Sequence, residues 1–333
     1  MKRRLVMSLI IIEILTTLFS LTFAQSKISN SMVPLPPGET SLLVIEAQPW
    51  LQVDSGSKVF LEGPAFDREG NLFVSSIFDS RIFKITPDKK VITILNIEGL
   101  LPDGIAIHKD GRLFVVCLSN KIITINPDGS NLTYIEARHH GKTIVGNDLV
   151  FDSKGNFYVT NWTGNLSDPK GGVYRFSSDL KNIAPVVENL ASPNGISFTP
   201  EGDGLWVSES GRNQLLRIGL LKDGISLHPI DGIKVAYRFT GAPGGPDSNK
   251  VDVKGNVYQC IMHQGRVLIL NRMGIPIANV LVPGRDEGKF LRTSNVAFKP
   301  GTDEVFLTTS GEGGAWIYKF RGLAEGLRLF SHQ

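Results

Sequence analysis

The stretch Gly245–Tyr258, GPDSNKVDVKGNVY, contains the features that decide the fold. A Gly-Pro pair leads into a polar side chain, Asp247, and Val251 and Val253 then alternate with polar residues as in a β-strand. Gly255 marks a turn, and a second apolar run follows it. The stretch therefore predicts two short antiparallel strands joined by a tight turn, with an acidic residue where the first strand begins.

The same unit occurs in six copies, spaced roughly 40–50 residues apart, which is a period typical of β-propellers. A single small sheet of this kind cannot bury its own faces, so the copies are expected to stack radially around one axis. Helical periodicity is absent over any useful length. The sequence therefore predicts an all-β fold, a six-bladed β-propeller. The equivalent oxygen-bearing residues of the six copies are Glu62, Asp103, Asn147, Asn194, Asp247 and Asn295.

These six side chains predict a central metal site, because equivalent positions in a radial array lie at one height around the axis. Carboxylate and amide oxygens without His or Cys suit a hard cation. Calcium is our first choice, since it accepts about six to eight oxygens in irregular geometry, and other divalent metals are the alternatives. The other explanation is that these Asx and Gly residues only form turns between blades. Six copies at one phase of the repeat favour the metal site.

The amino terminus is typical of a secretory signal. Lys2-Arg3-Arg4 precedes the apolar run Leu5–Phe23, and Ala24 suits cleavage before Gln25. An uncleaved signal anchor is the alternative, because the apolar run approaches the length of a membrane span. We expect a secreted or periplasmic protein with a signal peptide over 1–24, a linker or arm over 25–40 and a propeller domain over 41–333.

The net charge of the chain limits the kinds of partner it can bind, and its cysteine content limits the disulfides it can form. The formal net charge is +3 for 333 residues, and it is +1 without the charged residues of the leader. Such a chain has no basic footprint for nucleic acid, and we expect no membrane contact beyond an uncleaved anchor. No sequence feature sets the oligomeric state. Cys117 and Cys260 fall in the second and fifth blades, which are opposite in a six-blade ring, so we expect no disulfide.

A propeller must close its ring, and a strand from the start of the chain can complete the last blade. The strand-like run Ser41–Ala47 precedes the first repeat. We expect it to complete the sheet built from Val296–Phe320, with Leu327–Phe330 as a further addition.

Several motifs add specificity to the repeat. LEG at Leu61–Gly63, IHKDGRLFV at Ile107–Val115, VFDSKG at Val150–Gly155, QGRVL at Gln264–Leu268 and PGRDEG at Pro283–Gly288 follow in this order. Together they resemble the senescence-marker, regucalcin and gluconolactonase family of six-bladed propellers. The resemblance implies a calcium-dependent hydrolase with one ion at the channel mouth and a small-molecule lactone as its substrate.

The resemblance also implies roles for single residues. Transferred position by position, it gives as metal ligands Glu62, Asn147, Asn194 and Asp247, with Ser248 adjacent. It assigns proton transfer to Asp247, and a role as ligand only is the alternative. Asp103 and Asn295 complete the ring as candidate substrate contacts, or they cap strands. A relative has a second calcium in its second blade, but the loop after Cys117 lacks matching residues, so one ion is expected.

Two other functions remain open on the sequence alone. A related hydrolase would use the same site on aryl esters or phosphotriesters, and a non-catalytic propeller would bind a ligand there without turnover. The sequence has no G-x-S-x-G elbow, no H-E-x-x-H motif and no Walker A loop. These absences exclude three common alternative chemistries.

Overall fold

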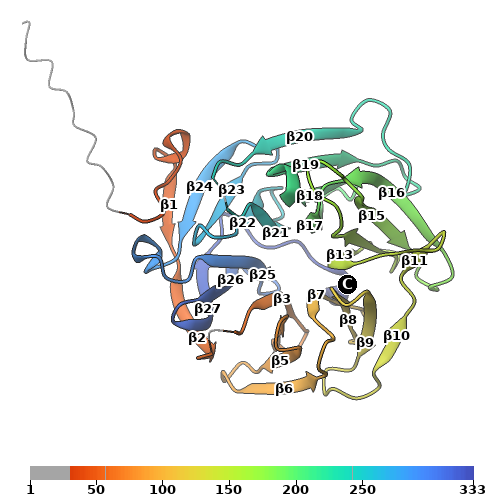
Figure 1. Ribbon diagram of the computed structural model, residues 1–333, viewed down its shortest axis with the longest axis horizontal. Coiled ribbons are helices and arrows are strands. Elements are labelled where there is room, and N and C mark those ends of the chain that lie inside the picture. Colours follow the sequence, from red (N-terminus) through yellow and green to blue (C-terminus); the bar gives the residue numbers. More distant parts are fainter. Residues whose placement is uncertain (1–30, 57, 242) are drawn as a thin grey trace, which may run out of the picture.

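The computed structural model describes residues 31–56, 58–241 and 243–333. In this part of the chain the strands form six blades around a central axis, as Figure 1 shows, so the predicted six-bladed all-β propeller is confirmed. The first strand of each blade lies at the axis, and these strands contact one another in a closed cycle. They are β3 (Leu61–Phe66), β7 (Pro102–Ile107), β13 (Gly146–Phe151), β17 (Pro193–Phe198), β21 (Pro246–Val251) and β25 (Arg292–Phe298).

The remaining strands of each blade follow outward from the axis in antiparallel order. Second strands are β4 (Leu72–Ser76), β8 (Leu113–Cys117), β14 (Phe157–Asn161), β18 (Gly204–Glu209), β22 (Val257–Ile261) and β26 (Glu304–Gly311). Third strands are β5 (Arg81–Ile85), β9 (Lys121–Ile125), β15 (Gly171–Phe176), β19 (Gln214–Gly219), β23 (Arg266–Leu270) and β27 (Gly314–Arg321). Fourth strands are β6 (Val91–Asn96), β10 (Thr133–Ile135), β16 (Ile183–Leu190), β20 (Ile233–Arg238) and β24 (Pro276–Leu281).

Proline opens three of the axial strands, at Pro102, Pro193 and Pro246. Proline has no N–H to donate and is normally confined to edge strands. An axial strand is the inner edge of its sheet, so proline is tolerated at this position. The edge location explains how a Pro-Asx-Gly sequence, which looks like a turn, is accommodated in a strand.

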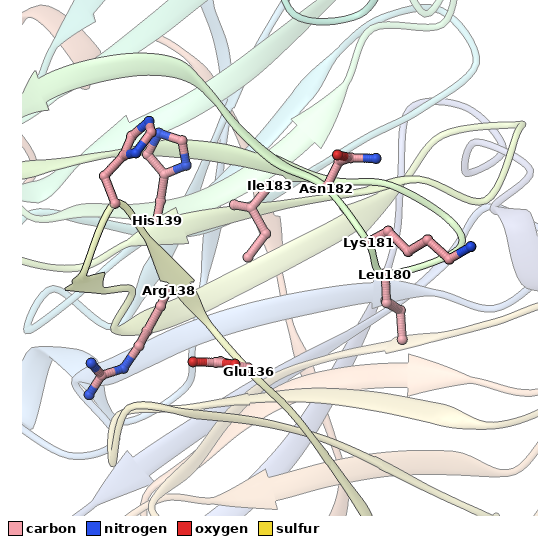
Figure 2. A pocket seen from close by; sticks show the side chains of 8 residues that line it. Glu136, Arg138, His139, Leu180, Lys181, Asn182 and Ile183 are labelled. Carbon is pink, nitrogen blue, oxygen red and sulfur yellow. The ribbon is translucent and has the colours of Figure 1, made fainter.

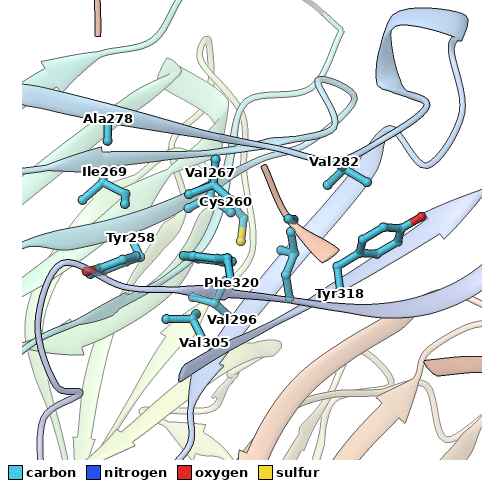
Figure 3. Close-up of a cluster of buried hydrophobic side chains, with 13 residues drawn as sticks. Tyr258, Cys260, Val267, Ile269, Ala278, Val282, Val296, Val305, Tyr318 and Phe320 are labelled. Carbon is cyan, nitrogen blue, oxygen red and sulfur yellow. The ribbon is translucent and has the colours of Figure 1, made fainter. Parts of the chain in front are cut away.

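Apolar side chains fill the spaces between neighbouring blades. The described residues contain six buried apolar clusters, and each spans one blade interface. Figure 3 shows the cluster between blades five and six, where Tyr258, Cys260 and Val267 meet Val296 and Phe320. Burial of this apolar area is the main force that holds the blades together. Both cysteines are buried and free, as expected.

The start of the chain closes the ring differently from our prediction. The segment predicted to complete blade six contributes β1 (Leu43–Glu46), which instead pairs in parallel with β24 as a fifth strand of blade five. The next segment, β2 (Gln48–Asp54), pairs antiparallel with β27 and completes blade six. This strand contains Pro49, which has no N–H to donate. It is accommodated because β2 is an edge strand whose register shifts at Pro49.

The end of the chain also lies elsewhere than expected. After β27 the tail leaves blade six, and Gly326 bridges to Asp252 of blade five. Phe330 then packs against Phe151 of blade three, and the Arg68 side chain of blade one donates to the carbonyl of Gln333 at 3.2 Å. Figure 1 shows the C-terminus among β7, β8 and β13. The tail therefore crosses the ring at the ends of the axial strands instead of adding to blade six.

The arm before β1 is packed against the propeller from Ser31 onward. The N–H of Met32 donates to the Asp286 carbonyl at 2.9 Å. The arm then forms a short 3₁₀ turn, η1 (Pro37–Glu39), in which Glu39 is buried. The predicted signal peptide lies outside the described residues. Within residues 31–56, 58–241 and 243–333, no helix is long and apolar enough to cross a membrane.

Candidate functional site

All six predicted ring residues lie in the axial strands and are buried. The pairing register between first and second strand shifts at this point in every blade, for example between Glu62 and Ala65 and between Pro246 and Asn249. Such a β-bulge bends the strand and redirects side chains. The six bulges give the ring residues a shared position at the start of the axial strands. A purely turn-forming role does not apply, because these residues lie in strands.

Glycine follows the ring residue in three blades because the axial strands approach closely there. A Cβ on Gly63 would lie 2.7 Å from the Ile105 nitrogen, and a Cβ on Gly104 would lie 2.7 Å from the Asp148 Cα. A Cβ on Gly195 would lie 2.6 Å from the Asn249 nitrogen. Real Cβ atoms do not occupy such positions, so only glycine permits this spacing.

Hydroxyl groups of one blade also bond to the ring of the next. The Ser75 hydroxyl donates to the Asp103 carbonyl, and the Thr160 hydroxyl donates to the Asn194 carbonyl, both at 2.6 Å. Both hydroxyls belong to second strands, β4 and β14. The ring backbone is therefore fixed by hydrogen bonds between blades as well as by packing.

The ring side chains contact one another directly. The Asn295 amide donates to Glu62 Oε2 at 2.8 Å, and the Asn147 amide donates to Asp103 Oδ2 at 2.9 Å. Neither Asp103 nor Asn295 lines the pocket described below. The structure places both as neighbours of predicted ligands, where they orient the oxygens of those ligands.

The ring carboxylates are held in an environment that opposes their negative charge. Burial raises the pKa of Glu62 to about 7, and the charge of Asp148 adds to this rise while the Asn295 amide opposes it. Burial and the charge of Glu62 raise the pKa of Asp103 and of Asp247 well above their usual range. Buried carboxylates that repel one another are stabilised when a cation binds among them. An all-oxygen donor set of this kind fits calcium.

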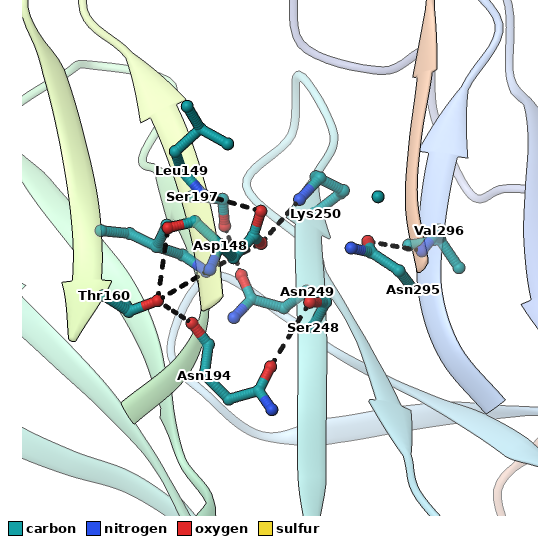
Figure 4. A network of polar contacts seen from close by, with 12 residues as sticks. Asp148, Leu149, Thr160, Asn194, Ser197, Ser248, Asn249, Lys250, Asn295 and Val296 are labelled. Atoms are coloured by element: carbon teal, nitrogen blue, oxygen red, sulfur yellow. Dashed lines mark hydrogen bonds and ion pairs between the residues drawn. The ribbon is translucent and has the colours of Figure 1, made fainter. Parts of the chain in front are cut away.

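Two charged residues on the axial strands were not identified as site residues from the sequence. Figure 4 shows Lys250 of β21 beside Asp148 of β13, with Lys250 Nζ 3.1 Å from Asp148 Oδ2. The Ile196 N–H also donates to this oxygen, at 3.3 Å. The sequence carried a signal that a partner exists, because a lysine within a buried axial strand needs a nearby anion.

A pocket of about 330 Å³ opens onto two ring residues, Asn194 and Asp247. Trp162 and Met262 contribute its largest apolar side chains, and Ser210 contributes a hydroxyl. Trp162 is 41% exposed, so its ring is available to a ligand. The pocket therefore combines an apolar wall with ring oxygens from two blades.

A second hollow, of about 480 Å³, contains no ring residue. It lies between the hairpin β11 (Arg138–His139)–β12 (Lys142–Thr143) and the turn before β16. Figure 2 shows that its polar side chains do not converge on a common point. His139 and His140 lie here, which separates them from the ring.

No group of three or more His, Cys, Asp or Glu side chains is placed to hold a metal ion in residues 31–56, 58–241 and 243–333. The predicted ligand set has only two such side chains, Glu62 and Asp247. Its other donors are the amides of Asn147 and Asn194 and the hydroxyl of Ser248. The predicted set therefore differs from a cluster of three or more His, Cys, Asp or Glu side chains, because amide and hydroxyl oxygens make up most of its donors.

Comparisons with known proteins identify the family to which the chain is similar. A family model described as the SMP-30/gluconolactonase/LRE-like region matches residues 60–311. The lactonase drp35 of Staphylococcus saprophyticus is 41% identical over 306 residues, which cover 89% of this chain and 93% of that protein. The lactonase drp35 of Staphylococcus aureus strain USA300 is 40% identical over 321 residues, which cover 94% and 98%.

Solved structures share the fold at lower identity. A luciferin-regenerating enzyme has a TM-score of 0.71 and 19% identity, over 85% of this chain and 98% of that chain. Regucalcin from Agrobacterium tumefaciens, described as a calcium-binding protein, has a TM-score of 0.68 and 18% identity, over 86% and 98%. The resemblance inferred from the sequence motifs is confirmed, and the lactonase relatives support hydrolysis of lactone esters.

Proposed function

The chain belongs to the SMP-30/gluconolactonase/LRE-like family, and from this premise we propose that it is a calcium-dependent lactonase. The position of Asp247, which is shared by the ring and the pocket, is the observation that best supports the proposal. This residue belongs to the ring of buried oxygen-bearing residues and also lines the pocket of about 330 Å³. A lactone held in that pocket would lie directly against the ring.

One calcium ion would be held by Glu62, Asn147, Asn194 and Asp247, with Ser248 adjacent. The mutual repulsion of the ring carboxylates supports a cation at this place. When bound, calcium would polarise the lactone carbonyl and lower the pKa of a bound water. The bulged backbone and the bonds between blades keep the ligands in position without the ion.

Asp247 would transfer the proton. Burial and the charge of Glu62 raise its pKa, and a carboxylate with a raised pKa holds a proton more readily once it has accepted one. Hydrogen bonds from the Asn194 side chain and the Ser248 N–H hold the carboxylate in place. In this role Asp247 accepts a proton from the attacking water and returns it to the leaving alkoxide.

Hydrolysis of a lactone panel tests the reaction class and the metal together. The chain is assayed as isolated, after chelation, and after calcium, magnesium, manganese or zinc is restored. We expect activity to vanish with chelator and to return with calcium. Aryl esters and a phosphotriester belong in the same panel, and turnover of these without lactone turnover would replace the proposed substrate class. Protein that holds calcium but hydrolyses nothing would indicate a ligand-binding propeller.

Asp247→Asn tests the proton transfer. We expect it to lower kcat by about 100-fold or more, because a positioned acid–base group contributes about that much. Asp179→Asn is the matched control, since Asp179 is exposed in a turn of blade three. A variant that keeps both its calcium and its turnover would remove Asp247 from this role.

We also propose that the protein is exported, with Met1–Ala24 removed as a signal peptide. Mass spectrometry of the protein from its own cells should then show a chain that begins at Gln25. An intact leader would support a membrane-anchored protein instead.

A further inference from the structure

The Asp148–Lys250 ion pair joins the axial strands of three blades. Asp148 lies on β13 of blade three and Lys250 on β21 of blade five, so blade four is between them. The N–H of Ile196 in blade four donates to the carboxylate oxygen that also receives Lys250. The exposed fractions of the two side chains are 2% for Asp148 and 19% for Lys250. Lys250 is therefore a nearly enclosed positive charge at a fixed place.

The strand that carries Lys250 is held by the neighbouring polar network. Asn249 is fully buried, accepts a hydrogen bond from Ser197 of blade four, and donates to the Ser208 hydroxyl at 2.9 Å. Ser208 in turn donates to Gln259 Oε1 at 2.8 Å. These bonds hold the part of the strand that carries Lys250.

The charge of Lys250 acts on the ring. Glu62, Asp103, Asp148 and Asp247, which all lie on axial strands, interact electrostatically with one another. Lys250 is two residues beyond Ser248 on the same strand, and its charge lowers the pKa of Glu62. Charges that are enclosed in protein interact more strongly and are screened less by salt than charges in water.

We propose that Lys250, clamped by Asp148, is a fixed internal cation that weakens metal binding at the ring and limits the channel to a single divalent ion. The ammonium compensates part of the negative charge that would otherwise attract a second ion. It also opposes the positive charge of the bound ion, so the ring holds calcium less tightly than its carboxylates alone would. This inference rests on the proposed calcium ring.

Calorimetric titration with calcium tests it, using chelator-treated full chain. Lys250→Met removes the positive charge and leaves Asp148 without its partner, so we expect affinity to rise by roughly tenfold or more. Asp148→Asn removes a negative charge and should lower the affinity for calcium.

The double variant Lys250→Met with Asp148→Asn removes both charges. It should return the affinity for calcium to within about threefold of the wild type. Lys250→Arg keeps the charge and should also bind as the wild type does. Lys154→Met, an exposed site, is the control.

The outcomes separate the inference from the proposed function. Wild-type chain that binds no calcium would overturn both. If the wild-type chain binds calcium and folded Lys250→Met binds it equally well or more weakly, the inference is overturned and the proposed function is not. If Lys250→Met does not fold, unchanged affinity in Asp148→Asn would overturn it as well.

Discussion

Gly195 shows how closely neighbouring axial strands approach at the ring. A Cβ at this position would meet the backbone of Ser248 and Asn249 in the next blade. Backbone atoms cannot move aside as a flexible side chain can, so the strands themselves would have to separate.

Gly195→Ala is therefore expected to lower the free energy of unfolding by about 2 kcal/mol or more. Gly38→Ala is the control, because nothing lies within 4 Å of a Cβ there, and we expect a change within about 0.5 kcal/mol. Urea unfolding measures both. Equal effects at the two positions would contradict the close approach of blades four and five.

The ring carboxylates predict an unusual pH dependence for the metal-free protein. The pKa of Glu62 is raised from 4.5 to about 7, so the folded state binds a proton that the unfolded state has released over this range. Stability should then fall as pH rises from 4.5 to 7, by about 3 kcal/mol from Glu62 alone. Asp103 and Asp247 act in the same direction. Asp110, whose pKa is lowered to about 2, titrates below this window.

Thermal unfolding with chelator across this pH range measures the effect. The melting temperature should fall toward pH 7, and calcium should reverse the fall because it binds the ionised carboxylates. Glu62→Gln should flatten part of the profile. A melting temperature that rises with pH in the presence of chelator would show that the carboxylates are compensated by other means.

At the scale of single residues, the positions of residues within the repeat predicted the ring. They did not predict the positive charge of Lys250 beside it. The six oxygen-bearing residues share one position in the repeat, which is readable from spacing. The Asp148–Lys250 pair joins blades three and five, and no spacing along the chain encodes that contact. It follows from the radius of the closed ring and from the directions of two bulged strands.

At the scale of elements, a buried ion pair helps to fix the arm before β1. Arg266 of β23 is fully buried and donates to Glu39, which also accepts a hydrogen bond from Tyr237 at 2.8 Å. The Asn279 amide donates to the Glu39 carbonyl at 3.2 Å. The arm is thereby fixed to blades four and five.

Glu39→Ala should lower the free energy of unfolding by about 3–5 kcal/mol, because it leaves the charge of Arg266 buried without its partner. Glu46→Ala is the matched control, since Glu46 is exposed on β1, and its effect should stay within about 0.5 kcal/mol. Denaturant unfolding compares the two. A similar small effect from both would mean that the arm detaches at little cost.

Second and third strands were readable as apolar runs between turn residues, whereas the elements at the chain ends were not. β2 contains Pro49 and half-exposed residues, so its pattern is weak. Its partner, β27, is at the far end of the sequence, and only ring closure brings the two together.

At the scale of the whole molecule, the C-terminal tail connects blades that are far apart. Phe330 is 4% exposed, and its ring centroid lies 5.0 Å from His108 and 5.4 Å from Phe151. Phe330→Ala should lower the free energy of unfolding by about 3 kcal/mol. The adjacent Leu329 is 45% exposed, and Leu329→Ala should cost less than about 1 kcal/mol. Calorimetric unfolding of the two variants measures these changes. Equal small losses of stability in both would mean that the tail contributes nothing.

The pairing of Gln48 with Lys319 has a consequence for protein synthesis. Translation proceeds at about 5–20 residues per second, so β2 exists for on the order of tens of seconds before its partner, β27, leaves the ribosome. During that time its edge is unpaired and available to other chains. The ring can therefore close only after β27 has left the ribosome, and protection of the nascent chain must last until then.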